Sequence, residues 1–395
     1  MSMSSATNKG WRFEGNERKY IDEVLSSGFA ATESGTFNER LERGFAEKHH
    51  QKYAITANSG TGTLHMALYA FVVGPGDEVI IPALTVAMCG YAVWQCGATP
   101  VYADVLPDTF LMDPADVERK ITPKTKAIMP VHIYGLMCDM TRIMEIAQRN
   151  NLFVVEDCAQ CFLATDEKGR IAGTVGHVGS WSFENSKHMS TGDGGIVTTD
   201  NEDFATKMRQ FGGVGFKNIK ASSGKVRIDR ALFQNPDWER HNIMAYNYRL
   251  PEIAAAVGLA QLERLDYFCE LRNLMGAAYL NAIGNHPFLS PQKVPAGFKH
   301  SYYTFGALYN GWEHGVAWQD FRAKYVEFGG DGIYAAWKTV NQEPAFRDNK
   351  IGWGEVPVAE KLQRNLMQFT ANQKDEAERT KQAEILQRTL AYFSK

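Results

Sequence analysis

Between residues 58 and 199, short apolar runs alternate with stretches that have the spacing of amphipathic helices. This alternation is typical of an α/β fold, in which helices cover both faces of a mostly parallel, mixed sheet. Such sheets bind ligands at the carboxyl ends of their strands, so we expect the functional residues there. The expected strands are Glu78–Pro82, Val101–Val105, Ala127–Ile133, Phe153–Asp157, Gly179–Phe183 and Gly195–Thr199, and the expected helices include Thr61–Val72, Met140–Asn150 and Asp203–Phe211.

The remainder of the chain predicts a second, smaller domain. A long, polar, glycine-rich segment, Gly212–Asn242, is expected to be mobile or held against a neighbouring subunit. The pattern then predicts a helix over Leu250–Leu265, with Pro251 in its first turn. We expect a large domain over residues 1–265 and a small α/β domain over 266–395, with a strand at Tyr302–Tyr309 and a closing helix at Asn372–Phe393.

Composition narrows the class of protein. The 395 residues are 44% hydrophobic and 22% charged, with a net charge of -3, which is typical of a globular enzyme and argues against a broad nucleic-acid-binding surface. No apolar run approaches the roughly 20 residues that span a bilayer. The first fifteen residues lack the apolar centre of a signal peptide, so we expect a cytoplasmic protein.

Two of the six cysteines are closely spaced. Cys158 and Cys161 stand in the sequence Cys-Ala-Gln-Cys, which raises the possibility of a metal site. No second pair of cysteine or histidine residues follows at ligand spacing. Reduced thiols in the core are therefore the favoured interpretation, and no metal is expected.

A lysine occupies an unusual position in the segment Trp181-Ser-Phe-Glu-Asn-Ser-Lys187-His-Met-Ser-Thr-Gly-Asp-Gly-Gly195. Lys187 lies in a polar loop between an apolar strand and a glycine-rich turn. A lysine that forms a Schiff base needs such a setting, because its amine must be fixed and partly desolvated to attack a carbonyl. An isolated lysine would be interpreted as a surface residue, but two other segments support the chemical role.

The first supporting segment is Val154-Val-Glu-Asp157-Cys-Ala-Gln160, an apolar strand that ends in two carboxylates. Asp157 is suitably placed to contact the pyridine nitrogen of pyridoxal phosphate, since a carboxylate there keeps the ring protonated. A helix N-cap is the alternative role for Asp157.

The second supporting segment is Thr56-Ala-Asn-Ser59-Gly60-Thr61-Gly-Thr-Leu-His-Met-Ala-Leu68. Small polar residues and glycines begin a helix here, and the backbone N–H groups at a helix N-terminus can bind phosphate together with nearby hydroxyls. A helix cap without a ligand is the alternative.

Together these segments resemble the sugar aminotransferase family typified by the DegT, DnrJ, EryC and StrS proteins, a branch of the fold-type I pyridoxal-phosphate enzymes. The resemblance extends in order along the chain, well from Gly28 to Leu265 and loosely beyond. It also includes Phe45–Lys48, Gly74–Pro82, Gly97–Asp104, Pro130–Gly135 and Asn247–Ala256.

This resemblance implies roles for individual residues. Lys187 would form the Schiff base and move protons between Cα of the substrate and C4′ of the cofactor, while Asp157 would pair with the pyridine nitrogen. Gln160 would lie near the phenolic oxygen, and Asn247 of the opposite subunit would complete the phosphate site, so a homodimer with shared active sites is implied. The implied cofactor-binding set is Gly60, Thr61, Asp157, Gln160, Ser182, Lys187 and Asn247.

Three further polar residues have two interpretations each. Arg249 is expected to brace the subunit interface, with contact to a substrate carboxylate as the alternative. His188 is either a substrate contact or a loop histidine bonded to the backbone, and His132, at a strand end, is equally open.

One departure from the family concerns the residue that stacks on the pyridoxal ring. The family commonly has an aromatic residue after Pro82-Ala-Leu-Thr85, where this chain has Val86. Either an aliphatic side chain covers the ring, or Met88 or Tyr91 replaces the aromatic residue.

The expected reaction is transfer of an amino group from glutamate or glutamine to a keto or aldehyde sugar. One expected acceptor is the C8 carbonyl of a 3-deoxy-octulosonate used for lipopolysaccharide, and a nucleotide-linked keto sugar is the alternative. A pyridoxamine-dependent sugar dehydratase is disfavoured, because that branch replaces the lysine by histidine and His188 is one residue out of register. A binding or regulatory protein is disfavoured by the presence of Lys187, Asp157 and the phosphate-binding segment together.

Overall fold

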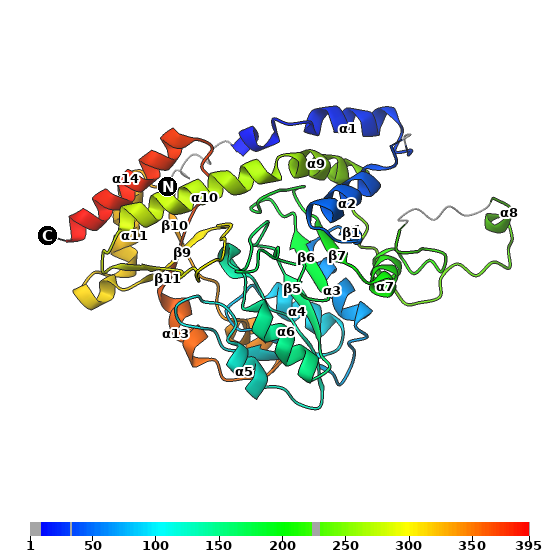
Figure 1. Ribbon diagram of the computed structural model, residues 1–395, viewed down its shortest axis with the longest axis horizontal. Helices are drawn as coiled ribbons and strands as arrows, with labels where there is room; N and C mark the ends of the chain where they lie inside the picture. The colour runs from blue at the N-terminus through cyan, green and yellow to red at the C-terminus, as the bar shows by residue number, and fades with distance from the viewer. Residues whose placement is uncertain (1–8, 32–33, 223–229, 395) are drawn as a thin grey trace.

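A computed structural model describes residues 9–31, 34–222 and 230–394. Its centre is a seven-stranded sheet (Figure 1), which the chain forms from β1 (Tyr53–Ala57), β2 (Glu78–Pro82), β3 (Thr99–Ala103), β4 (Thr125–Ile128), β5 (Phe153–Asp157), β6 (Val178–Ser182) and β7 (Gly195–Thr199). The strand order is β1-β7-β6-β5-β4-β2-β3, and only the pairings of β7 with β6 and β1 are antiparallel. The expected α/β fold with a mostly parallel mixed sheet is confirmed.

Helices that follow the strands pack on this sheet. Helix α6 (Met140–Arg149) shows why the sequence folds this way: Asp139 caps it by accepting a hydrogen bond from the Arg142 N–H at 2.9 Å. Its buried residues recur at a spacing of three and four, which gives it one apolar face. The other helices of this region are α2 (Phe37–Lys48), α3 (Gly60–Ala70), α4 (Met88–Gln95), α5 (Pro114–Arg119), α7 (Glu202–Gly212) and α9 (Glu252–Glu263).

A smaller antiparallel sheet forms the other end of the molecule. It contains β8 (Leu289–Pro291), β9 (Phe305–Tyr309), β10 (Ile333–Ala335) and β11 (Leu366–Phe369) in the order β10-β11-β9-β8. The long helix α10 (Leu265–Ile283) continues from α9 across residue 265, where we expected a domain boundary (Figure 1). Its first turns pack in the large core through Leu265 and Cys269, whereas Met275 and Tyr279 pack in a second core.

The remaining helices complete both ends of the molecule. Helix α14 (Glu376–Phe393) packs along α10, and α1 (Glu17–Ser26) packs on α9. The others are α8 (Arg230–Phe233), α11 (Trp318–Glu327), α12 (Pro344–Arg347) and α13 (Pro357–Asn365). None of the helices in the described part of the chain has the length and apolar composition needed to cross a membrane.

Several expected boundaries were wrong at their ends. The strand expected over Ala127–Ile133 ends at Ile128, because the chain then turns into a short 3₁₀ segment in which Tyr134 has a φ of 63°. Pro251 precedes α9 as its N-cap, with an extended ψ of 144°, and does not lie in the first turn. The strand expected from Tyr302 begins at Phe305, since Tyr302 has a φ of 45°.

The long segment expected over Gly212–Asn242 lies partly outside the described residues, which omit 223–229. Near its described ends Phe216 pairs with His241, and Gly213 pairs with Asn247, which lies just beyond the segment. Helix α8 stands apart from the body of the molecule (Figure 1). Contact of this segment with a neighbouring subunit stays a prediction.

Candidate active site

The loop that follows β6 carries Lys187. Its backbone N–H donates to the Glu184 carbonyl at 3.0 Å, which closes a turn. The side chain is half-buried, and its Nζ lies 4.4 Å from the centre of the Tyr303 ring. The Tyr303 hydroxyl is 2.8 Å from Ser186 Oγ. The amine therefore faces an aromatic ring, which attracts a cation, from the distant segment before β9.

Asp157, the last residue of β5, is a buried carboxylate without a cationic partner. It is 3% exposed. Oδ1 accepts a hydrogen bond from the Ala159 N–H at 2.9 Å, and Oδ2 accepts one from the Cys89 thiol at 3.2 Å. No lysine, arginine or histidine in the described residues forms an ion pair with it.

A thiol is a weak donor, and burial raises the pKa of the Cys89 thiol well above its usual range, so it stays protonated. Asp157 therefore retains the capacity to accept a strong hydrogen bond from a positively charged ligand group, which would offset the cost of burying its charge. The alternative of a helix N-cap is wrong, since the chain passes from β5 to β6 without a helix between Asp157 and Val178.

Gln160 is fixed close to the same strand end. It is 3% exposed, and its Oε1 accepts a hydrogen bond from the Tyr134 N–H at 2.8 Å. The left-handed backbone of Tyr134 directs this N–H toward the amide, so Gln160 is held by a backbone turn.

A helix N-terminus and a strand end meet beside these residues. Ser59 caps α3 by accepting a hydrogen bond from the Gly62 N–H at 3.0 Å, and the N–H groups of Gly60 and Thr61 have no carbonyl within the helix. A Cβ atom on Gly60 would lie only 2.6 Å from Ser182 Cβ. Because only glycine permits this approach, free N–H groups and a hydroxyl converge where an anion can bind.

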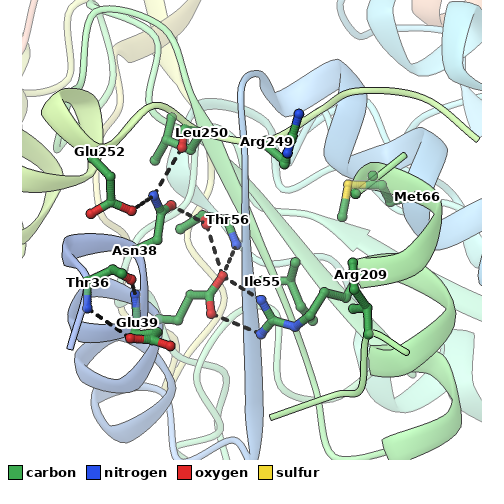
Figure 2. A pocket seen from close by; sticks show the side chains of 14 residues that line it. Thr36, Asn38, Glu39, Ile55, Thr56, Met66, Arg209, Arg249, Leu250 and Glu252 are labelled. Carbon is green, nitrogen blue, oxygen red and sulfur yellow. Dashed lines mark hydrogen bonds and ion pairs between the residues drawn. The ribbon is translucent and has the colours of Figure 1, made fainter. Parts of the chain in front are cut away.

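Asn247 and Arg249 lie together on the exposed surface. Arg249 Nε donates to Asn247 Oδ1 at 2.9 Å. Arg249 lines a pocket between α2, β1 and α7 (Figure 2). The buried Arg209 also lines this pocket and pairs with Glu42 at 2.9 Å. Lys187 does not line this pocket.

His188 points into the core behind Lys187. The ring is fully buried, and Nε2 lies 2.8 Å from the Ser301 carbonyl oxygen. Burial lowers the pKa of His188 well below its usual range, and the nearby arginine side chain of Arg272 lowers it further. A neutral ring that donates from Nε2 favours the interpretation of a loop histidine bonded to the backbone.

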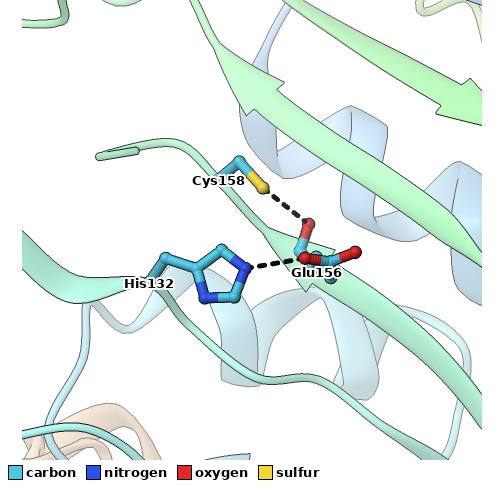
Figure 3. A group of neighbouring side chains, drawn as sticks. All are labelled: His132, Glu156 and Cys158. Carbon is cyan, nitrogen blue, oxygen red and sulfur yellow. Dashed lines mark hydrogen bonds and ion pairs between the residues drawn. The ribbon is translucent and has the colours of Figure 1, made fainter. Parts of the chain in front are cut away.

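His132 belongs to a buried cluster with Glu156 and Cys158 (Figure 3). His132 Nε2 lies 2.8 Å from Glu156 Oε2, and the backbone N–H groups of Gly173, Val175 and Gly176 also donate to this carboxylate. These four donors occupy the lone pairs that a metal ion would need. Burial raises the pKa of the Cys158 thiol well above its usual range, which disfavours the thiolate that binds metal. The cluster is therefore interpreted as structural.

Three residues were expected to be able to cover the pyridoxal ring. Val86 is half-buried, and Met88 is 47% exposed. The Tyr91 ring packs against Phe346, with 5.1 Å between ring centres. This packing makes Tyr91 the least suitable of the three.

Sequence reasoning missed three residues around Lys187, namely Arg12, Arg272 and Tyr303. The signal that could have found them is weak, because each stands among other polar residues in the sequence and belongs to no recognisable motif. Arg272 is 4% exposed within α10, and Arg12 is 2% exposed in the short 3₁₀ segment Lys9–Phe13.

Comparisons with known proteins identify the family of the chain. The model of the DegT/DnrJ/EryC1/StrS aminotransferase family matches residues 12–386. The GDP-perosamine synthase of Caulobacter vibrioides is 44% identical over 65% of this chain and 64% of its own length. That of Escherichia coli O157:H7 is 37% identical over 74% of this chain and 75% of its own length.

Solved structures cover more of the chain. An aminotransferase from Psychrobacter cryohalolentis has a TM-score of 0.85 at 28% identity over 100% of both chains. DesV from S. venezuelae has a TM-score of 0.82 at 28% identity over 95% of this chain and 94% of its own. The chain belongs to the DegT/DnrJ/EryC1/StrS aminotransferase family. The expectation of a pyridoxal-phosphate-dependent sugar aminotransferase is thereby confirmed.

Proposed function

We propose that this enzyme transfers an amino group from L-glutamate or L-glutamine to the carbonyl carbon of a nucleotide-linked keto sugar, with a GDP-linked sugar as the first candidate. The names of three relatives, each a GDP-perosamine synthase at 34–44% identity, support this acceptor. The observation that carries the reaction class is the buried Asp157 carboxylate, which lacks a cationic partner. It ends β5, and Lys187 follows the parallel neighbour β6, so both lie at the carboxyl edge of the sheet. The C8 carbonyl of a 3-deoxy-octulosonate stays a predicted alternative acceptor, and the assay described below includes it.

Pyridoxal phosphate, when bound, supplies an electron sink for the bonds at the amino carbon. Asp157 would hold the proton on the pyridine nitrogen, for which its free acceptor capacity is suited. Lys187 Nζ would hold the cofactor and then carry the proton that leaves the amino-acid Cα. Tyr303 limits the positions open to this amine, since its ring centre is 4.4 Å away.

The phosphate would bind at the N-terminus of α3. Gly60 and Thr61 would donate backbone N–H groups, and Ser182 would donate its hydroxyl. Asn247 is exposed on its own subunit, which suits a contact made across an interface. We therefore propose a homodimer in which Asn247 of one copy completes the site of the other.

The alternative of a sugar dehydratase is less well supported. That reaction requires a histidine in place of Lys187, and the neighbouring His188 is buried against the Ser301 carbonyl. A solved GDP-4-keto-6-deoxymannose-3-dehydratase shares the fold at 23% identity, which carries no argument about the reaction.

The test begins with the visible absorption of the purified protein. L-glutamate or L-glutamine should bleach the band of the bound cofactor in the wild type and in Lys168→Ala, an exposed control lysine, whereas Lys187→Ala should not respond. Bleached enzyme is then mixed with GDP-, UDP- or dTDP-linked 4-keto-6-deoxyhexoses or with the C8 aldehyde of 3-deoxy-octulosonate. Recovery of the band with a nucleotide-linked sugar supports the proposal, and recovery only with the octulosonate would overturn it. A wild-type band that neither donor changes would refute aminotransfer and favour a binding role.

A further inference from the structure

Arg12 holds the Lys187 loop from the N-terminal side of the chain. Its Nη1 donates to the Asn185 carbonyl at 2.8 Å, and its Nη2 donates to the carbonyls of Lys187 at 2.6 Å and His188 at 3.2 Å. Its own carbonyl accepts hydrogen bonds from Gln261 at 2.7 Å and from Arg264 at 3.1 Å. The short 3₁₀ segment is therefore fixed between the loop and the α9–α10 helices.

Arg272 holds the same loop from the other side. Its Nη2 donates to the carbonyls of Ser186 at 3.1 Å and Lys187 at 3.4 Å. Its Nη1 donates to the Tyr303 carbonyl at 2.5 Å. One guanidinium thus joins the backbone of the lysine to the backbone of the tyrosine whose ring faces the amine.

Both guanidinium groups are buried without an acid in contact. Neither forms an ion pair with a carboxylate in the described part of the chain, whereas Arg209, which is also buried, pairs with Glu42. Burial, and then repulsion from Arg12, lowers the pKa of Arg272 to about 10. Burial also lowers the pKa of Arg12, although Glu184 offsets part of this. Burying two cations that are hydrogen-bonded to carbonyls but paired with no carboxylate is costly, so a stability role alone explains the pair poorly.

We propose, on the basis of the function proposed above, that Arg12 and Arg272 are positioning residues for amino transfer. Together they fix the carbonyls of four consecutive residues, 185–188, and so present the Lys187 amine at one place. Arg272 also sets Tyr303 against that amine. A planar guanidinium can bridge two backbone segments, whereas the single ammonium group of lysine cannot span both at these distances.

The test compares Arg272→Lys and Arg12→Lys with Arg209→Lys, a conservative change at a buried arginine that makes no hydrogen bond to the Lys187 loop. Two rates are measured on the holoenzyme: release of the cofactor on dilution, followed by its visible band, and bleaching by L-glutamate. Thermal unfolding is recorded in parallel. We expect release at least tenfold faster and bleaching roughly 10- to 100-fold slower in the first two variants, because small misplacement of a reacting group has effects of that size. Arg209→Lys should stay within twofold of the wild type in both rates.

Rates in Arg272→Lys and Arg12→Lys within twofold of Arg209→Lys would overturn the inference. If circular dichroism shows that one of the two variants fails to fold, the release and bleaching rates of the other variant test the inference. A wild type that holds the cofactor but does not respond to glutamate or glutamine would refute the proposed function, and the release rates would then decide this inference separately.

Discussion

Gly60→Ala is a direct test of the phosphate site. The new methyl group would lie 2.6 Å from Ser182 Cβ and 3.2 Å from Ser182 Cα, whereas ordinary contact begins near 3.4 Å. The first turn of α3 must therefore move away from β6 by about 0.8 Å, because Ser182 is fixed in the sheet. Overpacking of this kind costs about 1–3 kcal/mol of folding stability.

The movement separates the α3 N–H groups from the Ser182 hydroxyl, so both can no longer bind one phosphate equally well. We expect the Kd for pyridoxal phosphate, measured by titration of the visible band, to rise at least tenfold, or about 1.4 kcal/mol. Loss of helix propensity cannot be the cause, since alanine favours helices more than glycine does.

Gly74→Ala is the matched control for this substitution. A Cβ atom at Gly74 would meet nothing within 4 Å, so cofactor affinity should not change. A Gly60→Ala protein that binds pyridoxal phosphate within twofold of the wild type would refute the phosphate site at α3. Equal losses in both variants would show that the effect is not local.

Three further predictions test other parts of the molecule. Asp157→Asn keeps an acceptor for Ala159 but removes the charge, so bleaching by L-glutamate should slow by about 100-fold or more; a rate within threefold of the wild type would contradict its role. Lys187→Ala and Asn247→Ala should each be inactive. When the two variants are mixed and reassociated, roughly half of the dimers are mixed and each of these has one complete site, so roughly a quarter of the wild-type activity should return. No recovery would contradict shared sites. Burial lowers the pKa of His49 and His300 from the ordinary 6.5 to about 4 and about 3. These two rings therefore bind fewer protons in the folded protein than in the unfolded chain below pH 6.5, and each should make the protein about 2 kcal/mol less stable to urea at pH 5 than at pH 7.5. A pH dependence that His300→Gln leaves unchanged would contradict this.

The sequence was most informative where local pattern and chemistry coincide. The strand Gly195–Thr199 was predicted with its observed bounds, because an apolar run is bounded by glycine and by a polar turn. Asp157 could be placed at a strand end because an apolar run ends there in two carboxylates.

Contacts from a side chain to backbone carbonyls far away in the sequence leave no local sequence pattern. Arg272 lies between Glu270 and Asn273 in the sequence of α10, where a charged residue would ordinarily be assigned to a solvated face. Its partners are carbonyl groups, which every residue carries, so no side-chain type in the loop reveals the contact. The start of α9 could not be predicted either, since Pro251 is compatible with both the N-cap and the first turn.

The contacts of Arg12 also constrain the order in which the protein can mature on the ribosome. Arg12 is synthesised early, but its partner Asn185 lies 173 positions later, and Arg272 and Tyr303 emerge later still. A nascent chain that ends before α10 can form the strands of the large sheet but cannot fix the lysine loop from both sides. We therefore expect the lysine loop to reach its final geometry only after α10 and Tyr303 have been synthesised.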